Sequence, residues 1–463
     1  MKNTRISTTT GIIVSSNGST PILLRNLQYG TIPYKSQIVF FSGSVKKDYD
    51  SLYTIGKKLN KFGFGYEIEP HINVGKVNQF LLPQAYIKAR YGAVEFYVGR
   101  KKEIQGLVDT TGTMGSYIWS GNALPLPKLD ISIPKFRSIT KNGLIAVKGN
   151  YAHGWFGDGD SVKNFFLHQK SFYGRLGKPN WKIKIIAGFN HQVQWGGRPA
   201  VPYKDKISNN LVTTFGNDFP TYIKAVTGIA VNRNQDGINS GINSNDALNR
   251  VGNHLGTVDI GAEISTSFAE INVYRQSIYE DGSLFYLSNI SDGLSGISIK
   301  LRNNKIFQKF TFEYLDTRNQ GGGVYLNEPP ELRGVDNYFG NSIYKDSWIY
   351  KGYILGSPLF RLMKEQGFSF GSNNPDAISS SRIKSINFSI NYKFKMLTFK
   401  SQTIKCLDLG NYFLPQNYQK LFMLQSISFG YKSFKFSGDF NLNLGQSTEN
   451  VFGINFKATK IWK

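Results

Sequence analysis

Apolar and polar residues alternate along much of this chain, over segments longer than the ~5 to 6 residues of an average soluble strand. Ile386, Phe388, Ile390, Tyr392 and Phe394 share one face of such a segment, and the Asn, Ser and Lys residues between them share the other. The same alternation is present at 62–69, at 310–314 and at 439–444. A period of two predicts β-strands with one apolar and one wet face.

These segments fit membrane-crossing strands, which need about 9 to 11 tilted residues with the apolar side toward lipid and the polar side toward the lumen. Hairpins follow one another directly: 84–91 turns at Gly92 into 94–99, and 427–431 turns into 434–444. We expect 451–456 to be the closing strand. The sequence predicts an all-β fold, a closed antiparallel transmembrane β-barrel of about 18 strands with long extracellular loops.

The barrel is expected to be one domain over residues 21–463, preceded by a loosely ordered segment at residues 1–20. Long Gly-, Asn- and Asp-rich connections occupy 231–253 and 321–350. A soluble β-sandwich or propeller would also alternate, because one face of each sheet packs inside. The strand length and a polar face rich in Asn, Ser, Lys and Gly favour the barrel, and no repeat of fixed period supports a propeller.

Composition excludes a helical membrane protein, because no stretch approaches the ~20 apolar residues of a spanning helix. Mean hydropathy is -0.29, while 34 Phe, 26 Tyr and 48 Gly favour β-structure. The single cysteine, Cys406, allows no intramolecular disulfide. The first residues lack the apolar core of a secretory signal. We expect an outer-membrane location, with a signal peptide removed.

The formal charge of +24 indicates an anionic partner. Lysines are spread singly along the strand-like segments, as at Lys393, Lys400 and Lys435, without a basic run or a nucleic-acid motif. The expected partners are therefore lipopolysaccharide phosphates or an acidic glycan, with no nucleic acid.

Residues that could carry catalysis are sparse. None of the five histidines is paired at a metal-ligand spacing, and there is no Walker loop and no GxSxG elbow. Carboxylates pair at Glu280 with Asp281 and at Asp158 with Asp160, but in Gly-flanked turns, where turn formation is the favoured explanation. The sequence predicts no metal, no cofactor and no enzymatic activity.

A more suggestive grouping sets aromatic rings beside amides, carboxylates and Arg. Trp155 and Phe156 adjoin Asp158 and Asp160 in HGWFGDGD, and the segment NHQVQWGGRP has the same character. A pyranose offers an apolar face that stacks on such rings, and hydroxyls that need fixed donors and acceptors. The alternative is that these aromatics form the interfacial girdles that barrels have in any case.

Several long stretches, taken in order, resemble the capsule assembly Wzi family, particularly its Bacteroidetes-type members. They are KGNYAHGWFGDGDSVKNFFLHQK (148–170), AGFNHQVQWGG (187–197), GNHLGTVD (252–259), VYRQSIYEDGSL (273–284), DGLSGISI (292–299), EYLDTRNQGGG (313–323) and DNYFGNSIYKDSWIYKGYILGSP (336–358). The resemblance runs over residues 21–457. It implies a large outer-membrane barrel that acts as a lectin and holds capsular polysaccharide at the cell surface.

If that role carries over, the recurrent polar blocks supply the glycan-binding candidates and no catalytic residue. These candidates are Trp155, Asp158, His191, Gln194, Trp195, Arg198, Asn253, His254, Asp259, Arg275, Gln276, Glu313, Asn319 and Gln320. Some are expected to brace the barrel instead, for example through an ion pair of Glu313 with Arg275. A transport porin, a glycosidase and an accessory subunit with envelope protein partners remain as alternatives, and the lumen is either open or plugged.

Overall fold

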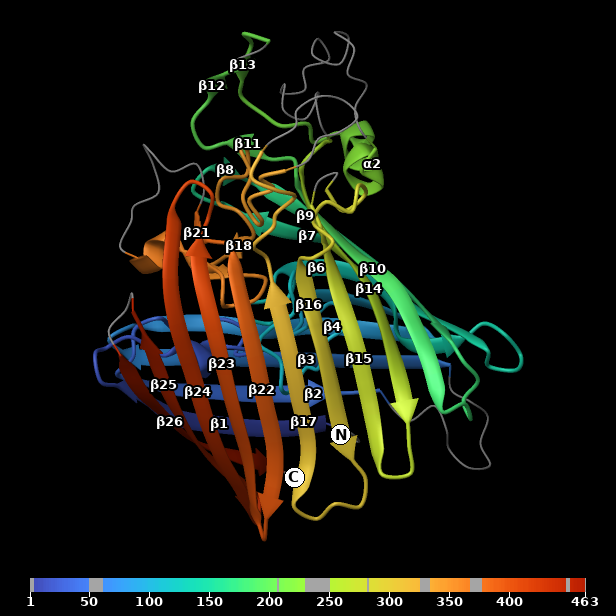
Figure 1. Cartoon of the computed structure of the whole chain (residues 1–463), viewed down its shortest axis with the longest axis vertical. Coiled ribbons are helices and arrows are strands. Elements are labelled where there is room, and N and C mark those ends of the chain that lie inside the picture. The colour runs from blue at the N-terminus through green and yellow to red at the C-terminus, as the bar shows by residue number, and fades with distance from the viewer. Residues whose placement is uncertain are drawn as a thin grey trace.

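The computed structural model describes residues 4–49, 61–205, 208–229, 250–280, 283–324, 334–366, 377–446 and 450–462. Over these residues, eighteen antiparallel strands form one sheet in which each strand pairs with its neighbours along the chain. Strand β1 (Thr4–Ser15) pairs with both β2 (Ile38–Lys47) and β26 (Val451–Trp462), so the sheet closes on itself (Figure 1). The predicted closed barrel of 18 strands is confirmed.

The other barrel strands are β3 (Phe62–Gly75), β4 (Gln79–Tyr91), β5 (Val94–Arg100), β6 (Pro127–Ser138), β7 (Ile145–Gly157), β9 (Phe165–Leu176), β10 (Ile183–Trp195), β14 (Asn253–Ser265), β15 (Ala269–Tyr279), β16 (Gly293–Leu301), β17 (Phe307–Asp316), β22 (Ile383–Phe394), β23 (Leu397–Gly410), β24 (Pro415–Tyr431) and β25 (Phe434–Gly445). The connections carry short two-stranded pieces: β8 (Val162–Lys163), β11 (Arg198–Pro199), β12 (Tyr203–Lys204), β13 (Leu211–Val212), β18 (Ile349–Tyr350), β19 (Tyr353–Ile354), β20 (Arg361–Leu362) and β21 (Ile378–Ser380). They also carry helices α1 (Ile22–Arg25) and α2 (Phe219–Thr227) and a 3-10 turn, η1 (Met363–Gln366).

The first strand differs from the expectation of a loosely ordered segment at residues 1–20. Thr4–Ser15 pairs along nearly its whole length on both sides, with Ile6 opposite Val45 on one side and Trp462 on the other. A barrel without this strand would leave two open edges of unpaired N–H and C=O groups, which lipid cannot satisfy. The Ser- and Thr-rich composition of the strand hid its alternation.

The two faces of the wall separate as the alternation predicts. Phe388 is 47% exposed on the outer face, whereas its neighbour Asn387 is fully buried on the inner face. Phe312 and Glu313 divide in the same way, at 46% and 0%. An outward apolar band and a polar interior are the pattern of a barrel that contacts lipid. No helix among the described residues has the length and apolar character to cross a membrane.

The two ends of the barrel differ (Figure 1). Short turns at 92–93, 139–144, 177–182, 266–268, 302–306, 395–396 and 432–433 join strands at the short-turn end, where β1 begins and β26 ends. Gly92 has a φ of +62°, which suits a two-residue hairpin turn. The connections at 101–126, 196–252 and 317–382 make the other end the long-loop end. The expected connection 231–253 lies outside the described residues up to 249.

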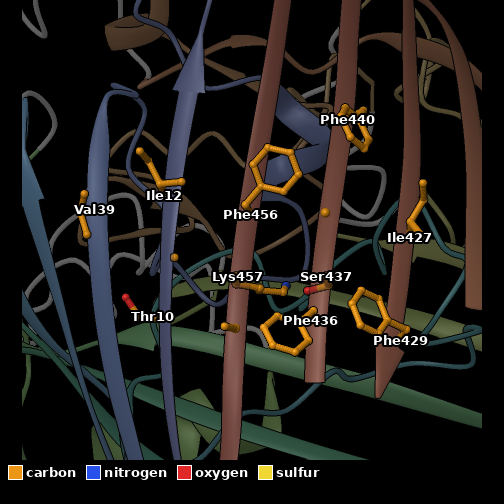
Figure 2. A pocket seen from close by; sticks show the side chains of 13 residues that line it. Thr10, Ile12, Val39, Ile427, Phe429, Phe436, Ser437, Phe440, Phe456 and Lys457 are labelled. Atoms are coloured by element: carbon orange, nitrogen blue, oxygen red, sulfur yellow. The ribbon is translucent and has the colours of Figure 1, made fainter. Parts of the chain in front are cut away.

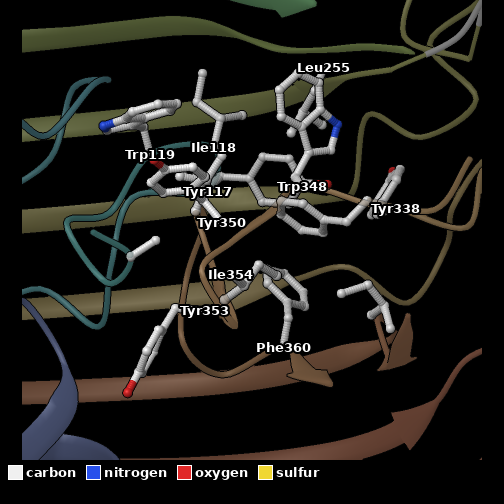
Figure 3. Packing of buried hydrophobic residues seen from close by; sticks show 14 of the residues in the cluster. Tyr117, Ile118, Trp119, Leu255, Tyr338, Trp348, Tyr350, Tyr353, Ile354 and Phe360 are labelled. Atoms are coloured by element: carbon white, nitrogen blue, oxygen red, sulfur yellow. The ribbon is translucent and has the colours of Figure 1, made fainter. Parts of the chain in front are cut away.

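Two of these connections fold back into the barrel, and residues 101–126 and 334–363 are called the plug below. They bind each other inside the lumen: the Asn122 side-chain amide donates to the Ile354 carbonyl at 3.1 Å, and the Ser120 N–H donates to the Leu355 carbonyl at 2.8 Å. The main apolar cluster of the molecule lies here (Figure 3). Trp348 and Tyr117 are fully buried within it, and the Tyr117 ring lies 4.9 Å from that of Phe339.

Ion pairs line the inner wall around the plug. Lys128 is almost completely buried and lies 2.8 Å from a carboxylate oxygen of Glu103, and Lys101 lies 2.8 Å from Glu95. Because Lys101 and Glu103 begin the plug, these pairs also tie its first residues to the wall.

Candidate functional site

Five predicted glycan-binding residues lie on the inner face of the wall, where they bind the plug or brace its contacts. Gln194, Asn253, Asp259, Gln276 and Glu313 are each at most 2% exposed. The plug has little regular secondary structure, so its buried N–H and C=O groups need partners from outside its own backbone. The inner wall supplies these partners.

Glu313 of β17 is the most heavily used anchor. One carboxylate oxygen accepts hydrogen bonds from the Thr113 and Tyr274 hydroxyls, each at 2.7 Å. The other accepts from the Met114 N–H at 2.8 Å and from the Asn387 side-chain amide at 3.0 Å. Two of the four donors belong to the plug, so this carboxylate joins the plug to strands β15, β17 and β22.

The other inner residues also hold the plug, or each other, through hydrogen bonds. The Gln276 amide accepts from the Tyr117 N–H at 3.0 Å and donates to the Leu107 carbonyl at 3.2 Å. Asp259 accepts from the Leu107 N–H at 2.8 Å. Gln194 donates to the Ser347 carbonyl at 2.9 Å, and its own oxygen accepts from Asn253 at 2.8 Å. These side chains have no exposed surface to offer a glycan while the plug is seated.

The expected ion pair between Glu313 and Arg275 does not form. Arg275 alternates with the inward Gln276 and therefore faces the other side of the wall. Its guanidinium donates to the Ser295 hydroxyl at 2.9 Å and to the Asp292 carbonyl at 2.7 Å. The two-residue period of the strand, rather than distance along the chain, separates the two charges.

Asn319 and Gln320 brace a loop at the long-loop end. Their backbone N–H groups donate to the Asp292 carboxylate at 3.1 and 2.7 Å, and the Tyr338 hydroxyl donates to it at 2.8 Å. Burial raises the pKa of Asp292, although these hydrogen bonds lower it in part. The Gln320 side-chain amide donates to the Ser381 carbonyl at 3.2 Å. Glu280 accepts from the Phe339 N–H at 3.2 Å, whereas Asp281 lies outside the described residues.

A second group of predicted residues lies on the outer face of β7, β10 and β14, near the long-loop end. Together with neighbours on β7 and β9 they form what we call the outer cluster: His153, Trp155, Phe166, His168, His191, Trp195 and His254. The His191 and His254 rings hydrogen-bond through a 2.9 Å contact. Trp155 is 38% exposed, whereas Trp195 is buried. No three His, Cys, Asp or Glu side chains of the described part of the chain are grouped to hold a metal ion.

Helix α2 covers the outer cluster. Asp218 caps its first turn by accepting from the Thr221 N–H at 2.8 Å, and Gly228 ends it with a φ of 64°. The Tyr222 ring packs 5.1 Å from Trp195, and its hydroxyl lies 2.6 Å from that of Tyr151. The helix therefore buries His191, Trp195 and His254 between itself and the wall and leaves Trp155 at the edge.

An open cavity of about 530 Å³ at the long-loop end includes one predicted residue, Asp158. Phe156 and Phe165 stack in parallel beneath it at 4.6 Å, and the Tyr350 ring lies 6.1 Å from Phe156. The exposed Asp158 and the exposed Lys351 lie at its edge. The cavity thus combines an aromatic base with charged groups of both signs.

Asp346 of the plug fixes the loop that carries Asp158 and Asp160. Its carboxylate accepts from the N–H groups of Asp160 at 3.0 Å and Ser161 at 2.8 Å. The Asp158 carboxylate accepts from the Asn164 N–H at 3.2 Å, which is the turn role expected from the Gly-flanked sequence. Arg198 lies beside this loop, exposed, in the β8–β11 ladder opposite Lys163.

Phe165, Asp346, Tyr350 and Lys351 were missed as cavity residues. They lie within the long stretches that carry the family resemblance, so a signal existed in the sequence. Nothing in the sequence indicated that residues 346–352 would meet residues 156–165, because this contact depends on the plug entering the barrel.

The stability of the barrel with its plug should depend on pH through Asp109, one of the residues that hold the plug. Asp109 forms an ion pair with Lys309 and accepts from the Gly112 N–H at 2.8 Å. Burial alone would raise the pKa of Asp109, but Lys309 and the N–H groups of Gly112 and Thr111 lower this pKa from 3.8 to about 2. Stability from this group is present above about pH 4 and is lost as the pH falls toward 2, a change on the order of 2 kcal/mol.

The measurement is the thermal midpoint of unfolding, read from the change in gel mobility between folded and unfolded protein after heating at several pH values between 5 and 2. The wild type should lose more stability across this window than the Asp109→Asn variant, in which the group cannot titrate. Parallel pH profiles for the two proteins would contradict the assignment.

Comparisons with known proteins give one family match and several solved structures of low sequence identity. The family model for capsule assembly protein Wzi matches residues 35–368. The comparison with curated proteins gives no match. Among solved structures, OccK5 (OpdH) of Pseudomonas aeruginosa aligns over 99% of this chain and 97% of its own, at 8% identity and a TM-score of 0.45. OccAB4 of Acinetobacter baumannii aligns over the same shares at 9% identity and a TM-score of 0.48.

Proposed function

The chain belongs to the capsule assembly protein Wzi family, and we propose that it binds capsular polysaccharide and holds it at the cell surface without catalysis. A closed barrel of this family is a protein of the bacterial outer membrane, with a role in capsule assembly. Short turns of such barrels face the periplasm and long loops face outward. The cavity beside Asp158 therefore opens on the side where a capsule lies.

The cavity is the observation that carries this proposal. Its volume of about 530 Å³ suits one or two sugar rings, since ligand sites span roughly 300 to 1,000 Å³. Phe156, Phe165 and Tyr350 form an apolar base to the cavity, but each is at most 5% exposed, so a pyranose would meet only a small part of their surface. Asp158 and Lys351 offer an acceptor and a donor for its hydroxyls.

The plug supports a binding role over a transport role. It occupies the lumen at the end from which a solute would enter, and wall side chains from several strands hold it there. The outer cluster is the alternative position for the glycan, with Trp155 as its accessible ring.

Replacing Asp158 by alanine should weaken capsular polysaccharide binding about five- to thirty-fold, because it removes one hydrogen bond to a bound ligand, worth roughly 1 to 2 kcal/mol. Lys351→Ala should act similarly. The measurement is glycan-array binding by the detergent-purified protein, followed by titration of the best glycan.

Two further variants distinguish the two possible positions of the bound glycan, the cavity and the outer cluster. Glu270→Ala removes an exposed carboxylate at the short-turn end and should leave binding unchanged. Trp155→Ala tests the outer cluster. Loss of binding in Trp155→Ala with full binding in Asp158→Ala and Lys351→Ala would move the site to the outer face. Unchanged binding in all three would refute both positions, and glycan turnover that is abolished in Asp158→Ala would refute the non-catalytic role.

A further inference from the structure

An apolar groove of about 550 Å³ lies on the wall where β24, β25, β26 and β1 meet (Figure 2). Phe456 and Ile12 at this groove are 48% and 43% exposed, whereas Asn441 and Asn455 on the opposite face of the same strands are buried. The groove therefore faces outward, toward lipid, and crosses the seam at which the first and last strands close the barrel.

Two small residues make the groove. Gly438 lies beneath the Phe456 ring, where an added Cβ would come within 2.9 Å of the ring. Ala458 pairs with Phe436 on one side and with Thr10 on the other, so its short side chain leaves space between the Phe436 ring and β1.

A cation lies next to the groove at the short-turn end. Lys460 is two residues beyond Ala458 on the same face of β26, about 7 Å along the strand. Its ammonium lies 3.7 Å from the centroid of the Trp462 ring and 5.5 Å from that of Phe434. No carboxylate among the described residues forms a salt bridge with it. Lys and Trp together are the usual residues at the level of lipid headgroups.

We propose that this groove binds one phospholipid of the periplasmic leaflet, with an acyl chain between Phe436 and Phe456 and the phosphate on Lys460. The short-turn end faces the periplasm, so Lys460 lies at the headgroup level of that leaflet. The groove volume lies within the range of specific ligand sites. The ammonium supplies charge complementary to the phosphate, and the rings supply contact along the chain.

The experiment is native mass spectrometry of the full chain in detergent, titrated with dipalmitoyl phosphatidylethanolamine. The wild type should bind one lipid saturably. Ala458→Phe, which fills the groove, should lower the affinity at least about ten-fold, and Lys460→Gln about five-fold, since one interfacial lysine contributes roughly 1 kcal/mol. Dipalmitoylglycerol, which lacks the phosphate, should bind more weakly and equally to the wild type and Lys460→Gln.

Ala187→Phe is the matched control, because Ala187 is an exposed outward alanine on β10, on the other side of the barrel. It should bind the phospholipid like the wild type, and the folded gel mobility of each variant shows that the barrel is intact. Equal binding by Ala458→Phe and the wild type would overturn the proposal. So would a wild-type dimer that Ala458→Phe dissociates without any lipid bound, or a preference for lipopolysaccharide over the phospholipid.

Discussion

The Glu313→Ala variant is expected to form a folded barrel whose plug is loosened, and to be destabilised by about 2 to 5 kcal/mol. The substitution removes the acceptor of four hydrogen bonds, among them the one from the buried Met114 N–H, while the Asn387 amide keeps its bond to the Gly112 carbonyl. In planar bilayers the wild type should show no steady conductance, because the plug fills the lumen. The variant should show intermittent openings, because the wall no longer holds residues 113 and 114.

Glu263→Ala is the matched control for this prediction. Glu263 is a carboxylate of β14 that pairs with Arg175 on the wall and is one-third exposed. A partly exposed ion pair contributes only about 0 to 1 kcal/mol, so the control should melt close to the wild type and stay closed. If Glu313→Ala has the conductance and the thermal midpoint of the wild type, Glu313 does not anchor the plug.

The Trp348→Ala variant is expected to have a free energy of unfolding about 3 to 5 kcal/mol lower than the wild type, the usual cost of truncating a fully buried aromatic side chain. The Trp348 indole is 0% exposed in the main apolar cluster (Figure 3). It lies 6.2 Å from the Phe156 ring. Since Phe156 also underlies the cavity, we expect weaker glycan binding together with faster proteolysis of the plug. The measurements are limited proteolysis, thermal gel shift and glycan titration on the same preparation.

Trp181→Ala separates loss of packing from loss of a tryptophan. Trp181 is 46% exposed in the 177–182 turn, so its removal should change the thermal midpoint little. Equal effects of the two substitutions would show that the plug core contributes nothing particular to stability.

Some predicted glycan-binding residues face the lumen and others face outward, and the two-residue period of the strands predicts which face each one occupies. Gln194 and Trp195 are adjacent on β10, so a period of two sends one inward to the plug and the other outward to α2. Asn253 and His254 divide in the same way. Candidates at adjacent positions of one strand therefore cannot share a site on one face of the wall.

Except in β1, whose Ser- and Thr-rich sequence masks the period, the alternation of apolar and polar residues predicted strands, the direction each side chain faces and, together with strand length, the closed barrel. It could do so because one lipid-facing side and one polar side impose the same two-residue period on every strand. The plug was decided only by the tertiary structure. Residues 101–126 and 334–363 have no period of their own, and contacts such as Asn122 with Ile354 join positions 232 residues apart. Such contacts exist only after eighteen strands have closed around a space that two aromatic-rich loops can fill.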